Sequence, residues 1–354
     1  MDQNYQMNSP KHILFLVPGF PADENDFNCI PPLQEFLLKF ESSYPDVKVT
    51  VISFQYPYQY KDYLWNGLKV FPLNGKNYAV KKPLIWLHAL LKATSNHKSN
   101  KIDVIHSLWL GECAMIGNIL SKKFNCLHIC TLMGQDVKSS NRYLRFLINK
   151  KIKIVALSRN QAEQFYNLTN KNVDEIIHWG IEDQNFENAE REIDLLAVGS
   201  LIPLKNYSLF IRLIAELKNT MPNLKCKLVG VGPEFSTLKT LATKKGILEN
   251  IEFTGLLSRS EIFKLMRKSK IFVHPSTFEG SGYVFAEALV NGMNIVSLNV
   301  GYAQQHPKWS IANDEEGFIN LVKTLLNKSL DYYPVNIFQL KETIERYASI
   351  YGLK

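Results

Sequence analysis

The chain has 354 residues, of which 46% are hydrophobic and 21% charged, with a formal net charge of +8. This length allows two domains with separate cores, and the composition is that of an ordinary soluble globular protein. We expect neither a membrane-spanning segment, since no apolar run approaches about 18 residues, nor a secretory signal at the polar start of the chain.

The positive charge is compatible with nucleic acid, an anionic membrane surface or an anionic substrate as a partner. Nucleic acid is not expected, because the sequence lacks an arginine-rich stripe with interleaved aromatic residues. Lysines of the N-terminal half fit either peripheral contact with an anionic membrane or a simple solvated surface; they stand at positions 81–82, 92, 98, 122–123 and 150–151. The five scattered cysteines have no metal-site spacing and indicate a reducing compartment. We therefore expect a cytoplasmic protein, with peripheral association to the inner membrane face as an option.

The first half of the chain alternates short apolar runs with longer amphipathic stretches, which is typical of βα units. Strands are expected at residues 13–17, 49–53, 102–106, 127–131 and 152–156. Helices are expected at residues 33–40, 83–94, 114–122 and 158–166.

A second series of the same kind follows a polar, acidic connector at residues 181–192. Its expected strands are 195–198, 225–229, 251–254, 271–273 and 294–297, and its expected helices 207–218, 234–245, 260–268 and 283–291. The pattern predicts an N-terminal domain at 1–182, a C-terminal domain at 183–335, and a last segment at 336–354. Two doubly wound domains imply a ligand cleft at the carboxyl ends of their strands.

Residues 274–289 are the most informative stretch, because a strand, a glycine-containing turn and a helix follow one another there. Such a turn presents free amides at the positive end of a helix dipole and favours anions. Glu279 and Glu287 frame the turn and would lie about 12 Å apart if the interval were helical. The carboxylates of a retaining hydrolase lie only about 5 Å apart. The spacing suits two ends of one extended ligand, such as a nucleoside diphosphate sugar; the alternative is a helix-start carboxylate and a solvated one.

This stretch resembles the E-x(7)-E motif of the retaining GT-B glycosyltransferases, in the glycogen-synthase-like "glycosyl transferases group 1" family (family 4 type). Matching features follow the family order from the first strand to about residue 300. The resemblance implies two Rossmann-like doubly wound domains facing across a cleft, with the last helix crossing back to the first domain. It also implies sugar transfer from a nucleotide-diphosphate sugar to a hydroxyl of a glycan or lipid-linked acceptor, with retention and without a metal. Bacterial cell-surface polysaccharide or glycolipid synthesis is the common context.

The resemblance assigns donor contacts in the C-terminal domain. Glu279 would hold hydroxyls of the transferred sugar and Glu287 the ribose. Lys205, in a segment similar to the family's G-R-x-x-x-x-K-G element, would neutralise the donor pyrophosphate, although Ser200 replaces the usual arginine and Asn206 the glycine. Further donor-binding positions are Gly280, Ser281, Gly282, Tyr283 and Val284 in the turn, Gly199 and Ser200 before Lys205, Gly230 and Gly232 in a GxGP turn, and Gly19 in the first domain.

The first domain supplies the remaining expected residues. Residues 131–136 resemble the family's T-x-H-G-x-D element, with Met133 in place of histidine, so that the element would act through Gly134 and the catalytic carboxylate of Asp136. His106 matches the family's H-x-H-W position and is expected on the acceptor side with Met133 and Gly134; a structural, hydrogen-bonded histidine is the alternative.

Two other functions remain open from the sequence. A GT-B protein that binds a nucleotide sugar but has lost catalysis is favoured by the departures at Ser200 and Met133. A sugar-nucleotide epimerase would bind a similar ligand, but the motif order is that of transferases.

Overall fold

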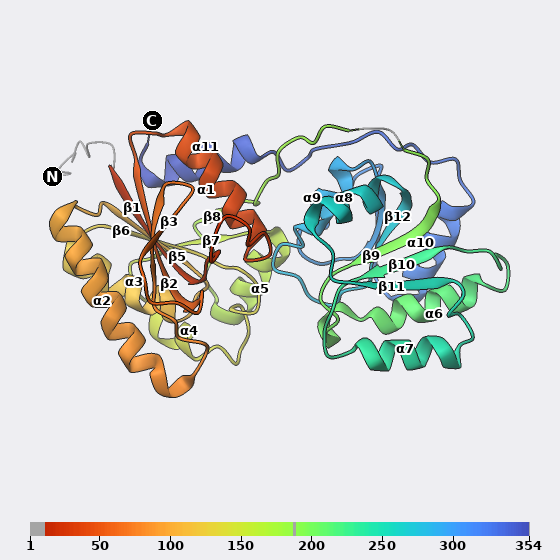
Figure 1. The fold of residues 1–354 in the computed structure, drawn as a ribbon, viewed down its shortest axis with the longest axis horizontal. Helices are drawn as coiled ribbons and strands as arrows, with labels where there is room; N and C mark the ends of the chain where they lie inside the picture. Colours follow the sequence, from red (N-terminus) through yellow and green to blue (C-terminus); the bar gives the residue numbers. More distant parts are fainter. Residues whose placement is uncertain (1–10, 187–188, 354) are drawn as a thin grey trace. The chain divides into compact units, whose positions relative to one another are not determined.

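The computed structural model describes residues 11–186 and 189–353. The chain divides into two compact units, which Figure 1 shows in colours that follow the sequence. Unit 1 comprises Met1–Gly180 and Leu340–Lys354, and unit 2 comprises Ile181–Gln339.

Unit 1 is built on an eight-stranded sheet in the order β3-β4-β2-β1-β5-β6-β7-β8. Every neighbouring pair is parallel except β3 with β4, which form an antiparallel hairpin at one edge. The strands are β1 (His12–Gly19), β2 (Lys48–Tyr56), β3 (Tyr63–Trp65), β4 (Leu68–Pro72), β5 (Val104–Leu108), β6 (Leu127–Thr131), β7 (Lys153–Ala156) and β8 (Glu175–Ile176).

Helices cover both faces of this sheet, as expected where parallel strands are joined by crossovers. One core contains buried side chains of α2 and α3 against the sheet, and α11 packs with α1. The helices of unit 1 are α1 (Pro31–Ser43), η1 (Ala79–Lys81), α2 (Lys82–Ser99), α3 (Glu112–Phe124), α4 (Arg142–Leu147), α5 (Arg159–Thr169) and α11 (Leu340–Tyr351).

Unit 2 has a six-stranded, entirely parallel sheet in the order β11-β10-β9-β12-β13-β14. The order reverses between β9 and β12, which pair with each other although 70 residues of chain separate their ends. The strands are β9 (Ile193–Val198), β10 (Cys226–Val229), β11 (Ile251–Gly255), β12 (Ser269–His274), β13 (Asn294–Leu298) and β14 (Trp309–Ala312). Their near-continuous apolar sequences are those of strands buried on both faces.

The helices of unit 2 follow the strands in alternation. Buried residues of α6 and α10 share one core with the sheet, while α8 and α9 contact each other and the strands β9, β12 and β13. The helices are η2 (Pro203–Lys205), α6 (Tyr207–Leu217), α7 (Phe235–Lys244), α8 (Arg259–Arg267), α9 (Val284–Val290) and α10 (Glu315–Leu326).

The expected pair of doubly wound α/β sheets is confirmed. Each strand expected from an apolar run is present, and the structure adds the β3–β4 hairpin, the short strands β8 and β14, and the helices α4 and α10. Within the described residues, no helix is both long and apolar enough to cross a membrane.

Candidate functional site

The carboxyl ends of β9 and β12 mark the point where the strand order of unit 2 reverses. Ligands of open α/β sheets bind outside the strand ends at such a point. The loop after β9 leads through residues 199–202 into η2 and Lys205, and the loop after β12 carries residues 275–283. The two loops are joined, because the Thr277 amide and the Ser276 hydroxyl both donate to the Leu204 carbonyl, at 2.9 and 3.0 Å.

Lys205 and Glu279 meet at this point, although 74 residues separate them in sequence. The Lys205 ammonium donates to Oε1 of Glu279 in a mostly buried ion pair. His274, the last residue of β12, contacts the same oxygen through Nε2 at 2.7 Å. Because an ionised carboxylate can only accept, Nε2 of His274 carries the proton. Two expected donor-site residues are thus in direct contact, and His274 is a third member to which the sequence analysis gave no role.

The three groups have complementary protonation states. Burial acts to raise the pKa of Glu279, but the bond from His274 and the charge of Lys205 outweigh it and lower the pKa to about 2. Burial lowers the pKa of His274, so that the ring is neutral. Glu279 is therefore a carboxylate at any physiological pH and cannot donate a proton as a general acid.

Because of this carboxylate, the free energy of unfolding should depend on pH in the acidic range. A pKa lowered from 4.5 to about 2 stabilises the folded state above pH 4.5, and the contribution disappears as the pH falls through 2. The shift corresponds to on the order of 3 kcal/mol. Urea unfolding should show wild type more stable than Glu279→Gln at pH 6, with the difference shrinking towards pH 2. Glu249→Gln, at an exposed carboxylate of the same unit, is the control. A pH-independent difference between wild type and Glu279→Gln would contradict the buried ion pair.

Two of the glycines expected to bind the donor, Gly230 and Gly232, are also required by the packing of the backbone. A Cβ on Gly230, whose φ is +142°, would lie 1.9 Å from the Gly199 carbonyl oxygen, and a Cβ on Gly232 would lie 2.4 Å from the Leu201 oxygen. The Gly199 and Leu201 amides donate to the carbonyls of Val229 and residue 231, at 3.0 and 2.9 Å. The GxGP turn therefore packs backbone to backbone against the loop that carries Lys205, and the glycines position this loop.

Two side chains beside this loop complete its description. Ser200, where the family has arginine, is exposed. The buried hydroxyl of Tyr207 has no hydrogen-bond partner within the described residues, and a Cβ on Gly199 would lie 2.6 Å from it. In the sequence, Tyr207 was expected only as the first residue of a helix. Its neighbours are apolar, so that the pattern did not indicate a role for its hydroxyl.

The turn from Gly280 to Val284 is fixed by a hydrogen bond from the segment after β13. Gly282 has a φ of +70°, and the Tyr302 amide donates to the Ser281 carbonyl at 2.8 Å. The following helix was expected at residues 283–291 but is observed as Val284–Val290, with Tyr283 at its N-cap. Seven residues give a weaker dipole than the expected helix, so that side-chain cations must supply more of the positive charge at the turn.

Glu287 pairs with a different cation from that of Glu279. Arg259, the first residue of α8, donates Nε–H to Oε1 of Glu287 at 2.7 Å, and its guanidinium stacks over the rings of Phe263 and Tyr283. Burial raises the pKa of Glu287, and Arg259 opposes this rise. Two separate carboxylate–cation pairs therefore flank the turn. Arg259 was missed in the sequence, where it stands between Ser258 and Glu261, the two residues of the capping box of α8.

In unit 1, Gly19 ends β1, and the 131–136 loop follows β6. Asp136 is buried and accepts hydrogen bonds from the amides of Leu110, Met133 and Gly134, at 2.9, 3.1 and 2.8 Å. Burial raises its pKa, against the effect of these amides. The carboxylate joins the loops after β5 and β6, which positions Gly134 and the half-buried Met133. The catalytic role expected for Asp136 stays a prediction.

His106, within β5, has the hydrogen-bonded arrangement expected of a structural histidine. Its ring is buried, with Nδ1 2.7 Å from the Tyr351 hydroxyl and Nε2 2.8 Å from the Thr131 hydroxyl. Burial lowers its pKa to about 3. A neutral histidine with both nitrogens hydrogen-bonded joins β5, β6 and α11, and its acceptor-side role stays a prediction.

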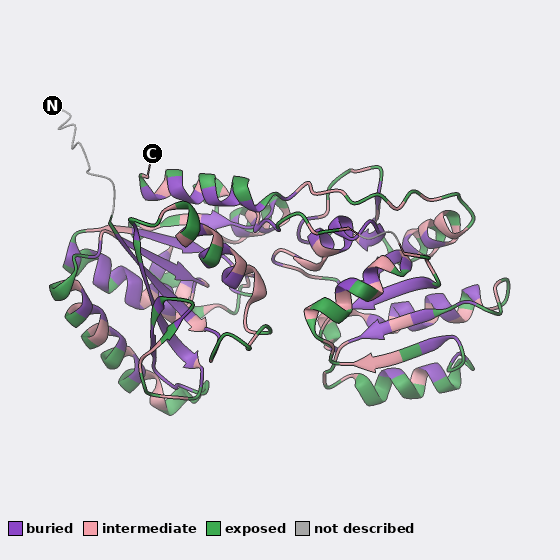
Figure 2. Ribbon diagram, turned by 45° about the horizontal axis from the view of Figure 1, so that its top comes forward, coloured by how far each residue is buried: buried purple, intermediate pink, exposed green. Residues whose placement is uncertain are grey.

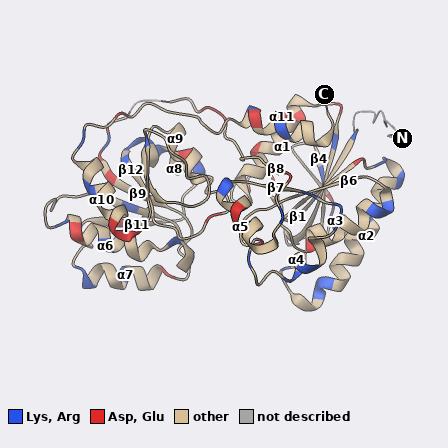
Figure 3. Ribbon diagram, turned by 180° about the vertical axis from the view of Figure 1, so that it is seen from behind, with Lys and Arg blue, Asp and Glu red and all other residues tan. Residues whose placement is uncertain are grey.

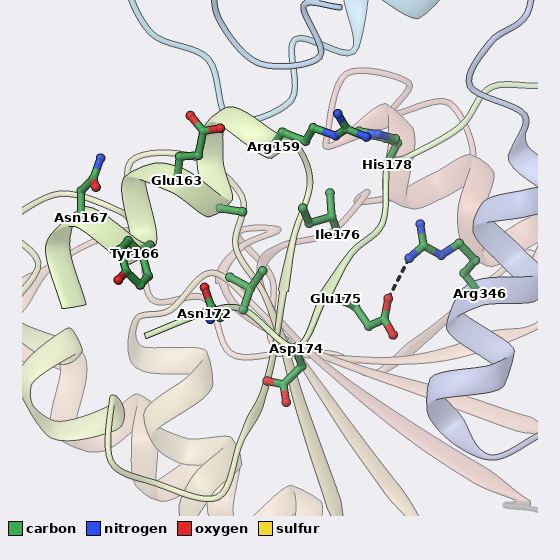
Figure 4. Close-up of a pocket in the computed structure, with 12 residues that line it drawn as sticks. Arg159, Glu163, Tyr166, Asn167, Asn172, Asp174, Glu175, Ile176, His178 and Arg346 are labelled. Atoms are coloured by element: carbon green, nitrogen blue, oxygen red, sulfur yellow. Dashed lines mark hydrogen bonds and ion pairs between the residues drawn. The ribbon is translucent and has the colours of Figure 1, made fainter. Parts of the chain in front are cut away.

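Unit 1 also contains an open hollow of about 880 Å³ between α5, β8 and α11. Figure 4 shows Arg159, Glu163 and Tyr166 on one side of it and the Glu175–Arg346 ion pair, 2.7 Å, on the other. Ser158 caps α5 by accepting a hydrogen bond from the Gln161 amide. The lining mixes both charges with amide groups, a chemistry suited to a hydroxylated ligand. None of Gly19, His106, Met133 and Gly134 lines it.

Within residues 11–186 and 189–353, no three or more His, Cys, Asp or Glu side chains are grouped so that they could hold a metal ion. The five cysteines are all free thiols.

Part of the sequence matches a known protein family. Residues 181–319 match the model of the glycosyl transferases group 1 family. An uncharacterized glycosyltransferase of Methanocaldococcus jannaschii is 28% identical over 213 residues, which are 58% of this chain and 58% of that protein. The chain thus spans little more than half the length of this curated relative.

Solved structures match nearly the whole chain. Sucrose-phosphate synthase from Thermosynechococcus elongatus superposes with a TM-score of 0.75 at 14% identity, covering 97% of this chain and 98% of that one. The Anabaena protein HepE in complex with UDP-glucose gives a TM-score of 0.68 at 17% identity, covering 97% and 95%. Both sheets thus have the GT-B fold, and residues 181–319 of unit 2 match the glycosyl transferases group 1 family.

Proposed function

We propose that the protein transfers a sugar from a nucleotide-diphosphate sugar to a hydroxyl acceptor, with retention at the anomeric carbon and without a metal ion. The observation that carries the proposal is the Lys205–Glu279 ion pair at the reversal of strand order in unit 2. The family match of residues 181–319 and the UDP-glucose bound by HepE support a nucleotide sugar as the donor.

Lys205 would stabilise the diphosphate that leaves during transfer. Charge develops on the phosphate oxygens as the glycosidic bond breaks, and a fixed cation in a mostly buried site stabilises it more than water does. In the absence of a ligand, Glu279 neutralises this cation. The donor diphosphate would take over part of that contact, and the unpartnered Tyr207 hydroxyl could donate to a phosphate oxygen beside Gly199.

Glu279 would act as an anion throughout the reaction. Its pKa of about 2 keeps it ionised, and it would accept hydrogen bonds from hydroxyls of the transferred sugar. A carboxylate in this position also favours the positive charge that develops on the sugar ring as the leaving group departs. His274 would hold the carboxylate oriented through its Nε2–H.

Glu287 would bind the ribose of the donor, with its carboxylate fixed by Arg259. The acceptor would be a glycan or a lipid-linked glycan, as in cell-surface polysaccharide or glycolipid synthesis. On the acceptor side we retain Met133 and Gly134, on the loop after β6, whereas Gly19, at the end of β1, would contact the donor.

The first test is thermal stability of the purified protein, without metal, in the presence of UDP-, GDP-, ADP- and TDP-sugars. A bound donor stabilises the folded protein by about 2.7 kcal/mol at a hundred times its dissociation constant. We expect one nucleotide class to raise the melting temperature of wild type but not of Glu287→Ala. Glu216→Ala, which removes an exposed carboxylate of α6, should respond as wild type does.

The outcome also separates an enzyme from a binding protein. Stabilisation accompanied by slow hydrolysis of the sugar nucleotide supports transfer chemistry, whereas stabilisation without any hydrolysis or transfer supports a protein that has lost catalysis. No stabilisation by any nucleotide would overturn the proposed donor site.

A further inference from the structure

The outward face of α2 is apolar and exposed. Leu84, Leu87 and Leu91 are 53%, 51% and 58% exposed and follow the i, i+3, i+7 spacing that places side chains on one side of a helix. Val80, in η1 directly before the helix, is 89% exposed. Figure 2 shows exposed segments along the outer side of α2.

These leucines are not needed to hold α2 on its sheet. The opposite side of the helix buries Ile85, Ala89 and Ala93 in the core of unit 1, with Trp86 and Leu90 packed against them. A helix that is apolar on both sides is normally buried on both sides. Its outer side therefore has the composition of a contact surface.

The surroundings of this face are strongly basic. Residues 76–101, which include η1 and α2, contain six lysines and neither Asp nor Glu. Residues 137–162, which include α4, contain seven lysines and arginines and again neither Asp nor Glu. The two segments are neighbours, since the Lys82 ammonium lies 6.0 Å from the Tyr143 ring. Figure 3 shows the basic residues on α2 and beside α4.

The charge of the whole chain is concentrated in the same unit. Unit 1 has 24 lysines and arginines against 16 acidic residues, a net +8, whereas unit 2 has 17 against 17, a net charge of zero. The formal charge of +8 is thus a property of unit 1 alone. The donor-site residues Lys205, Glu279 and Glu287 lie in the neutral unit, so that the anionic donor does not account for it.

We propose that the outer face of α2, with η1 and the basic residues around it, docks unit 1 on an anionic lipid bilayer. The three leucines would enter the boundary between headgroups and acyl chains, with α2 lying in the plane of the interface. The lysines on either side would contact the anionic headgroups, and their long stems let the ammonium groups reach them. A second copy of the chain fits this face poorly, because two such basic surfaces would repel each other. Nucleic acid would leave the leucines in water.

Sedimentation with vesicles tests this surface directly and does not require any nucleotide or acceptor. The full chain should sediment with vesicles of 70% phosphatidylcholine and 30% phosphatidylglycerol at low salt, and much less with pure phosphatidylcholine. The triple variant Leu84→Ser, Leu87→Ser, Leu91→Ser should bind the anionic vesicles at least about thirtyfold more weakly. Lys81→Glu with Lys82→Glu should weaken binding by roughly tenfold or more, and added salt should do the same to wild type.

The control places the same chemical change elsewhere. Leu248→Ser with Leu256→Ser removes two exposed leucines of unit 2 and should bind as wild type does. Melting temperatures of all variants establish that they are folded, and the lysine variant leaves the leucine face intact. Equal binding to neutral vesicles, undiminished binding of the leucine variant, or no binding to anionic vesicles would each overturn the proposal. So would a dimer of the wild type that the leucine variant loses, since the face would then bind a second copy.

Discussion

Replacing Lys205 with alanine should lower the rate of sugar transfer by at least about a hundredfold. This is the usual effect of removing one group that stabilises charge in a transition state, about 2.7–4 kcal/mol. The variant also leaves Glu279 buried with His274 as its remaining neutral partner, which raises the pKa of Glu279 relative to wild type. Initial rates with saturating donor, measured across pH, would report both effects.

Two further variants test whether the charge of Lys205 causes this loss of rate. Lys205→Arg keeps the charge but not the point geometry of an ammonium, so that it should recover part of the lost rate. Lys323→Ala, which removes an exposed lysine paired with Glu216, should leave the rate unchanged. If Lys205→Ala kept more than a third of the wild-type rate while Lys323→Ala behaved normally, Lys205 would not stabilise the leaving diphosphate.

Gly230→Ala should cost about 3 kcal/mol or more of stability and also disturb the loop that carries Lys205. Its added methyl would lie 1.9 Å from the Gly199 carbonyl oxygen, and its φ of +142° is unfavourable for alanine. Neither backbone can move without breaking the bonds that join the ends of β9 and β10. Overpacking and backbone strain each contribute roughly 1–3 kcal/mol.

Gly246→Ala separates the two contributions. Gly246 also has a positive φ, +66°, but a Cβ there would meet no atom within 4 Å. We expect a loss of about 1 kcal/mol from backbone strain alone, measured for both variants by urea unfolding. Equal losses would show that contact with the Gly199 carbonyl is not the cause of the larger effect.

The elements of the fold were largely predictable because each depends on local sequence. Buried parallel strands such as β9 and β12 are short apolar runs, and glycine or proline ends most of them. The β3–β4 hairpin was missed, because Tyr63–Trp65 is too short to show an alternating pattern. The helix α4 was missed for a similar reason, since Arg142–Leu147 is one and a half turns long and basic.

The candidate site was predictable as a set of loops, but not as a set of contacts. Lys205 and Glu279 were both expected near the donor, yet their pairing depends on the adjacency of β9 and β12, which sequence spacing does not give. Arg259 could not be identified for the same reason, because its partner Glu287 lies 28 residues away on another helix. The sequence does not distinguish the possible roles of His106 and Asp136, because a polar residue at or after a strand end has the same pattern whether it faces a ligand or the protein interior.

The return of α11 to unit 1 has a consequence for how the chain folds as it is synthesised. Tyr347 and Tyr351 supply the hydroxyls that bind Thr131 and His106, and Tyr347 packs on Phe36 of α1. All residues of unit 2 precede α11, so that unit 2 can fold before unit 1 has its last helix. Until then, the neutral His106 ring and the aromatic residues of α1 remain uncovered. On the ribosome, the N-terminal unit is therefore the last to be completed, and this exposed aromatic face is where a nascent chain would need protection from aggregation.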